Sequence, residues 1–174
     1  MAWETQTMRL AFQQICAGER EWTALGNFMN YWYSYAKDRR EELVADPLPA
    51  YDEQSLHDHR WAVFCAASVE WFCHKYHVAC PEWVHDPKYT LAEPWYFYKN
   101  LFGHETESQR EKLRQVTPEE FTRRNVYCGD NCYDNKWEAS ERVRERAQMI
   151  MRMSKEERRE FWKAQGMKVQ RGVW

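Results

Sequence analysis

Two cysteines and two histidines near the middle of the chain have side chains that could hold a metal ion. They follow the spacing C-x3-H-x2-C-x4-H, and thiolate and imidazole groups are ligands that zinc prefers. The ligands would be Cys73, His77, Cys80 and one of His85, Cys128 or Cys132. The spacing is not that of a zinc finger, and Cys73 also belongs to the apolar face of a predicted helix. We therefore predict no bound metal or other cofactor, and keep a small zinc-binding protein as an alternative.

A second group that could do acid–base chemistry or bind metal is His57-Asp58-His59. It falls in the first turn of a predicted helix, where acidic and capping residues are common for structural reasons. We interpret it as a solvated helix start. The chain also has no G-x-S-x-G, H-E-x-x-H or glycine-rich phosphate motif. We predict that the protein is not an enzyme.

Two adjacent arginines offer binding chemistry. A guanidinium group can bind a carboxylate or a phosphate through two parallel hydrogen bonds. Arg123 and Arg124 are therefore candidates for contact with an acidic partner or a nucleic-acid backbone. We favour an internal role over these, in which one arginine holds the preceding loop through Glu82, Asp86 or Glu93.

Residues 80–96 form a segment rich in proline and aromatic residues, called here the Pro-aromatic segment. Its prolines exclude a single regular element, so we predict an ordered loop between helices. Trp83, Trp95 and Tyr96 either fill the core or form an exposed anchor patch, as aromatic residues often do at protein interfaces. All three are candidate partner-binding residues.

The charge of the chain is divided unevenly. Residues 136–174 contain eleven Lys/Arg and six Asp/Glu, a balance of +5, whereas the remainder has fourteen basic and twenty-one acidic residues, a balance of −7. This basic tail predicts an amphipathic helix that can dock in a partner groove. Met151 and Trp162 are its candidate partner-binding residues. Acidic residues interspersed in the tail argue against a membrane surface as the partner.

The elements that position these residues are predicted to be helices, because apolar residues recur at helical spacing. The expected ranges are 5–17, 21–44, 55–77, 108–116, 136–153 and from 154 to before 166, with a short helix starting at 117 and an extended stretch over 125–128. Ser55 is a plausible N-cap, and Thr117 and Ser154 each begin a capping box. No alternating strand pattern is evident, so we predict the all-α class: a compact helical domain with an ordered loop and an amphipathic tail.

Length and composition predict a single cooperative domain in three parts. These are a helical pair and linker over 1–54, a helical core over 55–135, and the tail over 136–174. No apolar run approaches the roughly 20 residues of a membrane span, and the N-terminus lacks the pattern of a signal peptide. The six cysteines then favour reduced thiols, and we expect a cytoplasmic protein with no membrane partner.

Four segments in order resemble a family of small bacterial domains. The segments are Arg60-Trp61-Ala62, Pro81-Glu82-Trp83 with Asp86-Pro87, Glu93-Pro94-Trp95-Tyr96, and Pro118-Glu119-Glu120-Phe121 with Arg123-Arg124-Asn125-Val126-Tyr127. Over about residues 60–128 the chain is similar to a C-terminal domain that follows XRE-type helix-turn-helix regions in some regulators and antitoxins of toxin–antitoxin-like loci. The resemblance implies no catalytic activity. In other bacterial proteins such a domain stands alone behind a helical N-terminus similar to this one. Residues 1–54 show no helix-turn-helix, which argues against direct DNA binding.

Together these observations predict a bacterial, antitoxin-like or regulatory component that sequesters or scaffolds a partner protein. That partner would be a toxin-like enzyme or a complex subunit. A nucleic-acid-binding regulator that uses the basic tail with Arg123 and Arg124 is the main alternative.

Overall fold

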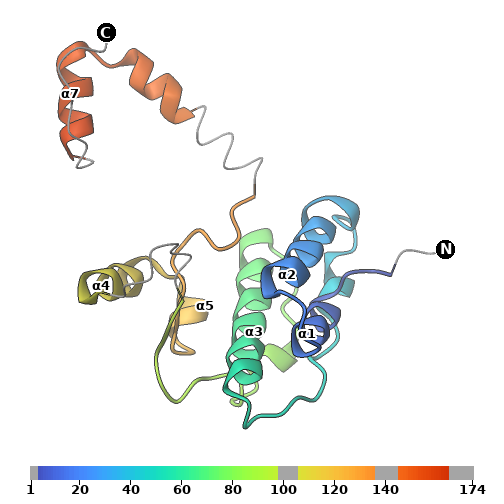
Figure 1. Ribbon diagram of the computed structural model, residues 1–174. Coiled ribbons are helices and arrows are strands. Elements are labelled where there is room, and N and C mark those ends of the chain that lie inside the picture. The colour runs from blue at the N-terminus through green and yellow to red at the C-terminus, as the bar shows by residue number, and fades with distance from the viewer. Residues whose placement is uncertain (1–3, 98–105, 136–144, 165–174) are drawn as a thin grey trace. The chain divides into compact units, whose positions relative to one another are not determined.

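The computed structural model describes residues 4–97, 106–135 and 145–164. The chain divides into two compact units, Met1–Tyr133 and Asp134–Trp174, called here the body and the C-terminal unit (Figure 1). The predicted segment 1–54 and nearly all of 55–135 therefore fall in one unit. Helices dominate, and the strands among the described residues are two pairs of residues, so the predicted all-α class is confirmed.

Helix α3, Leu56–Tyr76, lies at the centre of the body. Ser55 caps its start as predicted, because its hydroxyl accepts a hydrogen bond from the N–H of Asp58 (3.3 Å). The helix ends at His77, whose φ of 55° is the left-handed conformation that commonly follows a helix. Every residue from Trp61 to Glu70 is buried, so other elements cover the middle of α3 on all sides.

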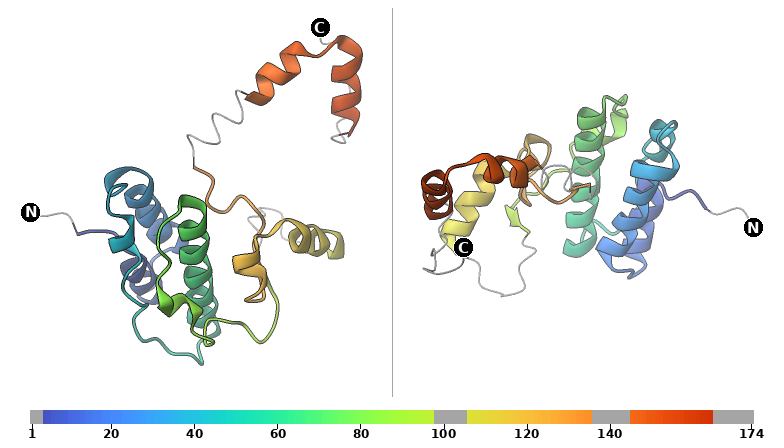
Figure 2. Two further views of the ribbon diagram at one scale, coloured as in Figure 1. Left: turned by 180° about the vertical axis from the view of Figure 1, so that it is seen from behind. Right: turned by 90° about the horizontal axis from the view of Figure 1, so that it is seen from above.

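Helices α1 (Met8–Cys16) and α2 (Glu21–Asn30) pack against each other, beside α3 (Figures 1 and 2). Aromatic rings contribute to the contact with α3. Phe28 of α2 meets Phe72 of α3 edge to face, with ring centroids 5.4 Å apart, an arrangement that aromatic pairs prefer.

The prediction of one continuous helix over 21–44 is wrong. The α-helix gives way to a π-helical turn, Tyr31–Tyr35 (η1), and a separate 3-10 turn follows at Arg40–Leu43 (η2). Arg40 bridges the break, because its Nε donates to the carbonyl of Trp32 (3.0 Å) and its guanidinium lies 5.3 Å from the centroid of that ring. This tertiary contact overrides the helical periodicity of the sequence.

The second half of the body consists of short elements. They are η3 (Glu82–His85), β1 (Trp95–Tyr96), α4 (Glu107–Val116), α5 (Glu119–Thr122) and β2 (Val126–Tyr127). Elements η3 and α5 pack on α3, and α4 packs on β2. Strands β1 and β2 form a parallel pair in which Trp95 lies opposite Val126. The sequence predicted an extended stretch over 125–128 but not its partner.

The predicted capping box at Thr117 is wrong. Pro118 is the N-cap of α5 and makes no side-chain cap, whereas the Thr117 hydroxyl accepts a hydrogen bond from the N–H of Gly129 (2.8 Å). Gly129 has a φ of +81°, which glycine adopts without steric cost. Thr117 therefore anchors the turn after β2.

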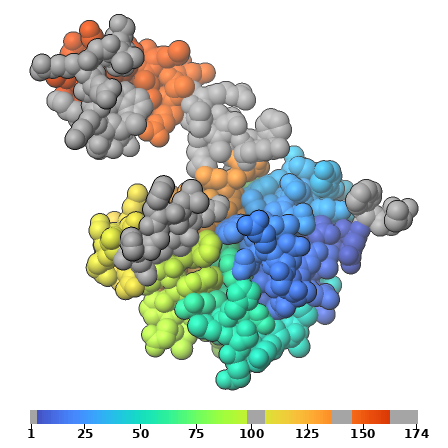
Figure 3. Space-filling model, in the orientation of Figure 1, coloured from blue at the N-terminus to red at the C-terminus, as the bar shows by residue number. Residues whose placement is uncertain are grey.

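Aromatic side chains fill the interior of the body. Phe72 is fully buried, and the ring centroids of Phe28, Trp32, Trp71 and Tyr133 lie 4.7–5.4 Å from its own. In the space-filling view the surface around residues 85–95 (yellow-green) continues into that around 45–60 (blue-green) (Figure 3). Element η3 of the Pro-aromatic segment packs on α3, and Val84, Tyr89 and Leu91 are buried, so the segment belongs to the packed body.

The C-terminal unit contains helical residues 145–152 and helix α7, Lys155–Ala164. The capping box predicted at Ser154 is confirmed. The N–H of Glu157 donates to the Ser154 hydroxyl (3.1 Å), and the Glu157 carboxylate accepts from the N–H of Ser154 (2.6 Å). Residues 136–144 of the predicted preceding helix lie outside the described part. Among the described residues, no helix has both the length and the apolar character that crossing a membrane requires.

Candidate functional site

A buried carboxylate organises the arginine pair. Glu70 lies on α3 with 1% of its surface exposed and forms ion pairs with both Arg123 and Arg124, the second at 2.5 Å. The ring of His85 lies near the same carboxylate, with Nδ1 3.8 Å from Oε1. One acid thus faces two guanidinium groups. Glu70 and Arg124 are enclosed and interact strongly because little solvent screens them, whereas the side chains of Arg123 and His85 are exposed.

Arg124 links three elements of the body. Besides the Glu70 carboxylate, its guanidinium donates to the carbonyl of Glu120 in α5 (2.7 Å) and to that of Val84 in η3 (2.8 Å). Burial lowers the pKa of this guanidinium below its ordinary value. Its contacts join α3, α5 and the Pro-aromatic segment. We predicted that one arginine would bind the carboxylate of Glu82, Asp86 or Glu93. The carboxylate that Arg123 and Arg124 bind is that of Glu70, and none of their described hydrogen bonds or ion pairs involves the three predicted acids.

Sequence analysis missed Glu70, although a signal for it exists. Residues 61–73 read W-A-V-F-C-A-A-S-V-E-W-F-C, in which Glu70 is the one charged residue. A charge inside such an apolar run must find a partner when it is buried. Arg123 and Arg124 could have been proposed as its partners on that ground.

The aromatic residues of the Pro-aromatic segment have internal contacts. The indole N–H of Trp83 donates to the carbonyl of Val44 (2.9 Å), and Trp95 lies edge to face on Trp61, with centroids 5.5 Å apart. Both indoles are half-buried. They fix the segment to the body, and each keeps an edge at the surface.

Tyr96 lies in a stack of side chains. Its ring is parallel to that of Tyr127, with centroids 4.8 Å apart, and Arg114 of α4 lies over the ring at 5.3 Å. Arg114 also donates through Nε to the Tyr96 hydroxyl (2.8 Å). Tyr96 therefore joins α4 to the strand pair.

The candidate metal ligands do not assemble into a site. In the described ranges no three His, Cys, Asp or Glu side chains are placed to hold a metal ion. Cys73 and Cys80 do lie in hydrogen-bonding contact, and burial, followed by the neighbouring Cys80, raises the pKa of Cys73 to about 12. His77 ends α3, whereas His85 lies in η3 beside Glu70.

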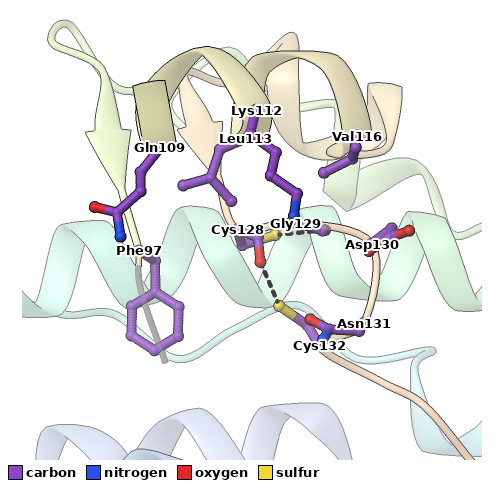
Figure 4. A pocket seen from close by; sticks show the side chains of 10 residues that line it. All are labelled: Phe97, Gln109, Lys112, Leu113, Val116, Cys128, Gly129, Asp130, Asn131 and Cys132. Carbon is purple, nitrogen blue, oxygen red and sulfur yellow. Dashed lines mark hydrogen bonds between the residues drawn. The ribbon is translucent and has the colours of Figure 1, made fainter. Parts of the chain in front are cut away.

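An open pocket of about 380 Å³ lies between α4 and the turn after β2 (Figure 4). Lys112 and Leu113 line it from α4, and Cys128, Asp130 and Cys132 line it from the turn. Figure 4 shows the Cys132 sulfur beside the carbonyl oxygen of Cys128. Sequence analysis considered these two cysteines only as substitute metal ligands, because the turn that brings them together depends on tertiary contacts.

The C-terminal unit exposes apolar side chains among charges. Met151 is 81% exposed and Met149 is 44% exposed. Within the unit, the guanidinium of Arg146 lies 5.5 Å from the ring centroid of Phe161, so a cation–π contact connects the helical segment 145–152 with α7. Trp162 belongs to α7, but its side chain lies outside the described part.

Comparisons with known proteins assign the chain to no family. No family model matches it, and neither a curated protein nor a solved structure matches it. The resemblance to antitoxin-associated domains therefore stays a prediction, and the functional argument depends on the geometry of the molecule itself.

Proposed function

We propose that this protein is a non-catalytic, cytoplasmic interaction component that binds an acidic surface of a partner protein through its C-terminal unit. Such a component acts as an antitoxin-like or regulatory protein, by sequestering or scaffolding its partner. The observation that carries the proposal is the exposure of Met151 and Met149 on a helical segment with basic residues around them.

The internal contacts of the body favour the C-terminal unit as the binding surface. Arg124 is occupied by Glu70 and two backbone carbonyls, and the indole N–H of Trp83 is occupied by a third. A partner that used these groups would have to replace buried hydrogen bonds, each of which costs about 1–3 kcal/mol when left unmade. A partner that binds the exposed methionines breaks no buried hydrogen bond.

The composition of the C-terminal unit fits a protein partner. Flexible methionine side chains adapt to irregular apolar surfaces, and the exposed Arg152, Lys155 and Arg159 provide a charged rim around them. The balance of +5 over residues 136–174 attracts an acidic surface. Glu156 and Glu157 lie among these cations and would repel a phosphate backbone, so protein is favoured over nucleic acid.

The test is co-purification of the tagged full-length chain from its native cells, with four versions compared. Beside the natural chain, M149E/M151E places two acids on the proposed surface, and M149L/M151L keeps its apolar character. L56E is the matched control, because Leu56 is 61% exposed on the body. We expect a protein to co-elute with the natural, leucine and L56E chains, and its affinity to fall at least about tenfold for M149E/M151E.

Two results would contradict the proposal. One is that the natural chain elutes alone, or that the M149E/M151E chain binds the partner as tightly as the natural chain does. The other is that nucleic acid co-elutes, with an affinity that falls steeply with salt as counterion release requires. The second result would support the nucleic-acid-binding alternative.

A further inference from the structure

We propose that Cys128 and Cys132 form a dithiol site that reacts with small disulfides of the glutathione class in the pocket beside α4. The product is an intramolecular disulfide between the two cysteines. The site belongs to the body and does not depend on the proposed partner of the C-terminal unit.

The turn after β2 places the two sulfur atoms together. The Cys132 thiol donates to the carbonyl of Cys128 (3.1 Å), and the Cys128 thiol donates to the carbonyl of Gly129 (3.7 Å) (Figure 4). Gly129, between them in the chain, has a φ of +81° and is held by the Thr117 hydroxyl at 2.8 Å. A disulfide needs its two sulfur atoms about 2 Å apart, so the side chains of Cys128 and Cys132 must rotate toward each other when it forms.

The pocket gives a small reagent a route to these sulfurs. Cys128 and Cys132 are only 6% and 8% exposed, yet both line the open pocket of about 380 Å³. Binding sites for small molecules begin at about 300 Å³. Lys112 offers an ammonium and Gln109 an amide at the α4 wall, both suited to the carboxylates of glutathione. Asp130 is the acidic group that lines the opposite side.

The reaction consists of two exchange steps. In the first, the Cys132 sulfur attacks one sulfur of the small disulfide. The reagent's S–S bond breaks, Cys132 becomes a mixed disulfide, and one small thiol leaves with the electron pair and takes up the proton lost from Cys132. In the second, the Cys128 sulfur attacks the Cys132 sulfur, and the other small thiol leaves with the proton of Cys128. The protein loses two electrons and two protons, and the reagent gains them.

The order of attack follows from the environment of Cys128. Its hydrogen bond to Cys132, followed by burial, raises the pKa of the Cys128 thiol far above its usual range. Cys128 thus keeps its proton, and Cys132 attacks first. A sulfur in a mixed disulfide carries no charge. Once Cys132 is in that form it no longer opposes ionisation of Cys128, and Cys128 can complete the exchange.

The other cysteines provide internal references. Cys65 is completely buried in the core, where burial raises its pKa, so we expect it to be inert. Cys73 and Cys80 also lie near each other, but they do not line the pocket beside α4. Nor do they line a second pocket, which lies beside η2. Cys16 is exposed, so its modification by glutathione disulfide provides the reference with which that of Cys132 is compared.

The experiment treats the folded full-length chain with glutathione disulfide, quenches with acid and maps each cysteine by peptide mass spectrometry. In the natural chain and in C80S we expect a Cys128–Cys132 disulfide. In C128S we expect glutathione attached to Cys132, because the resolving thiol is missing. In C132S no intramolecular disulfide can form, and we expect glutathione attached to Cys128, because the neighbouring sulfur that opposes its ionisation is missing. Circular dichroism shows whether each variant keeps its helix content.

The natural chain alone can overturn the proposal, even where a variant fails to fold. Cys132 unmodified under conditions that modify Cys16 or Cys80 would show that the pocket admits no reagent. Glutathione on Cys128 with Cys132 still a thiol would contradict the order of attack.

Discussion

The body and the C-terminal unit use aromatic residues and charges in opposite ways. In the body, rings such as Phe72 are buried among other rings, and Glu70 is enclosed by arginines. In the C-terminal unit, a ring is covered by a guanidinium, and methionines remain exposed. All the buried hydrophobic residues of the described chain lie in the body, so the described residues of the C-terminal unit form no core that could enclose its methionines.

The strongest test of this contrast compares two phenylalanines. F72A removes a ring at the centre of the aromatic cluster, and we expect it to lower the free energy of unfolding by about 4 kcal/mol because it leaves a cavity. F161A removes a ring that makes the cation–π contact with Arg146, and should cost less than about 1 kcal/mol. Urea unfolding followed by tryptophan fluorescence and circular dichroism measures both. Equal losses would break the contrast between the units.

A second test concerns the buried carboxylate. E70Q removes the charge that faces Arg123 and Arg124, and we expect a loss of about 3 kcal/mol because the buried guanidinium of Arg124 loses its counter-ion. E111Q is the matched control: Glu111 pairs with Arg114 at the surface (3.2 Å), and such a pair contributes below about 1 kcal/mol. A loss for E70Q no larger than for E111Q would mean that Glu70 is not needed to hold the arginines.

A third test addresses the local stability of the C-terminal unit. S154A removes the hydroxyl that caps α7, and we expect the helix to lose about 1 kcal/mol. Far-UV circular dichroism should show reduced helix content, while the tryptophan-monitored unfolding midpoint of the body stays unchanged. S154T keeps a capping hydroxyl and should restore most of the signal. A shifted body midpoint in S154A would show that the two units unfold together.

The smallest expected effect depends on pH. His57 lies between Asp58 (3.0 Å) and Glu21 (2.9 Å), and hydrogen bonds to these carboxylates raise its pKa above the ordinary 6.5. Folding therefore favours the protonated ring, so this stabilisation is complete below about pH 6.5 and is lost as the pH rises through the raised pKa. Because the side chain is 50% exposed, the effect stays below about 1 kcal/mol. The difference in unfolding free energy between the natural chain and H57N should shrink from pH 5.5 to pH 8.5, and a constant difference would contradict the assignment.

Local signals predicted much of the helical framework. The boundaries of α3 follow from Ser55 and from the apolar spacing up to Tyr76, and the capping box at Ser154 is local by nature. The continuous helix expected over 21–44 failed where Arg40 reaches back to Trp32. The cap expected at Thr117 failed because Gly129, twelve residues later, takes its hydroxyl.

The sequence by itself determined the helical class and the separation of an acidic body from a basic tail, since both follow from composition and short-range periodicity. Only the tertiary structure decided that Arg124 binds Glu70, that Trp95 pairs with Val126 and that Cys128 meets Cys132 beside α4. The first two contacts join residues far apart in the chain, and the third depends on a turn held by Thr117. Spacing within one element carries no information about such contacts; packing in three dimensions selects them.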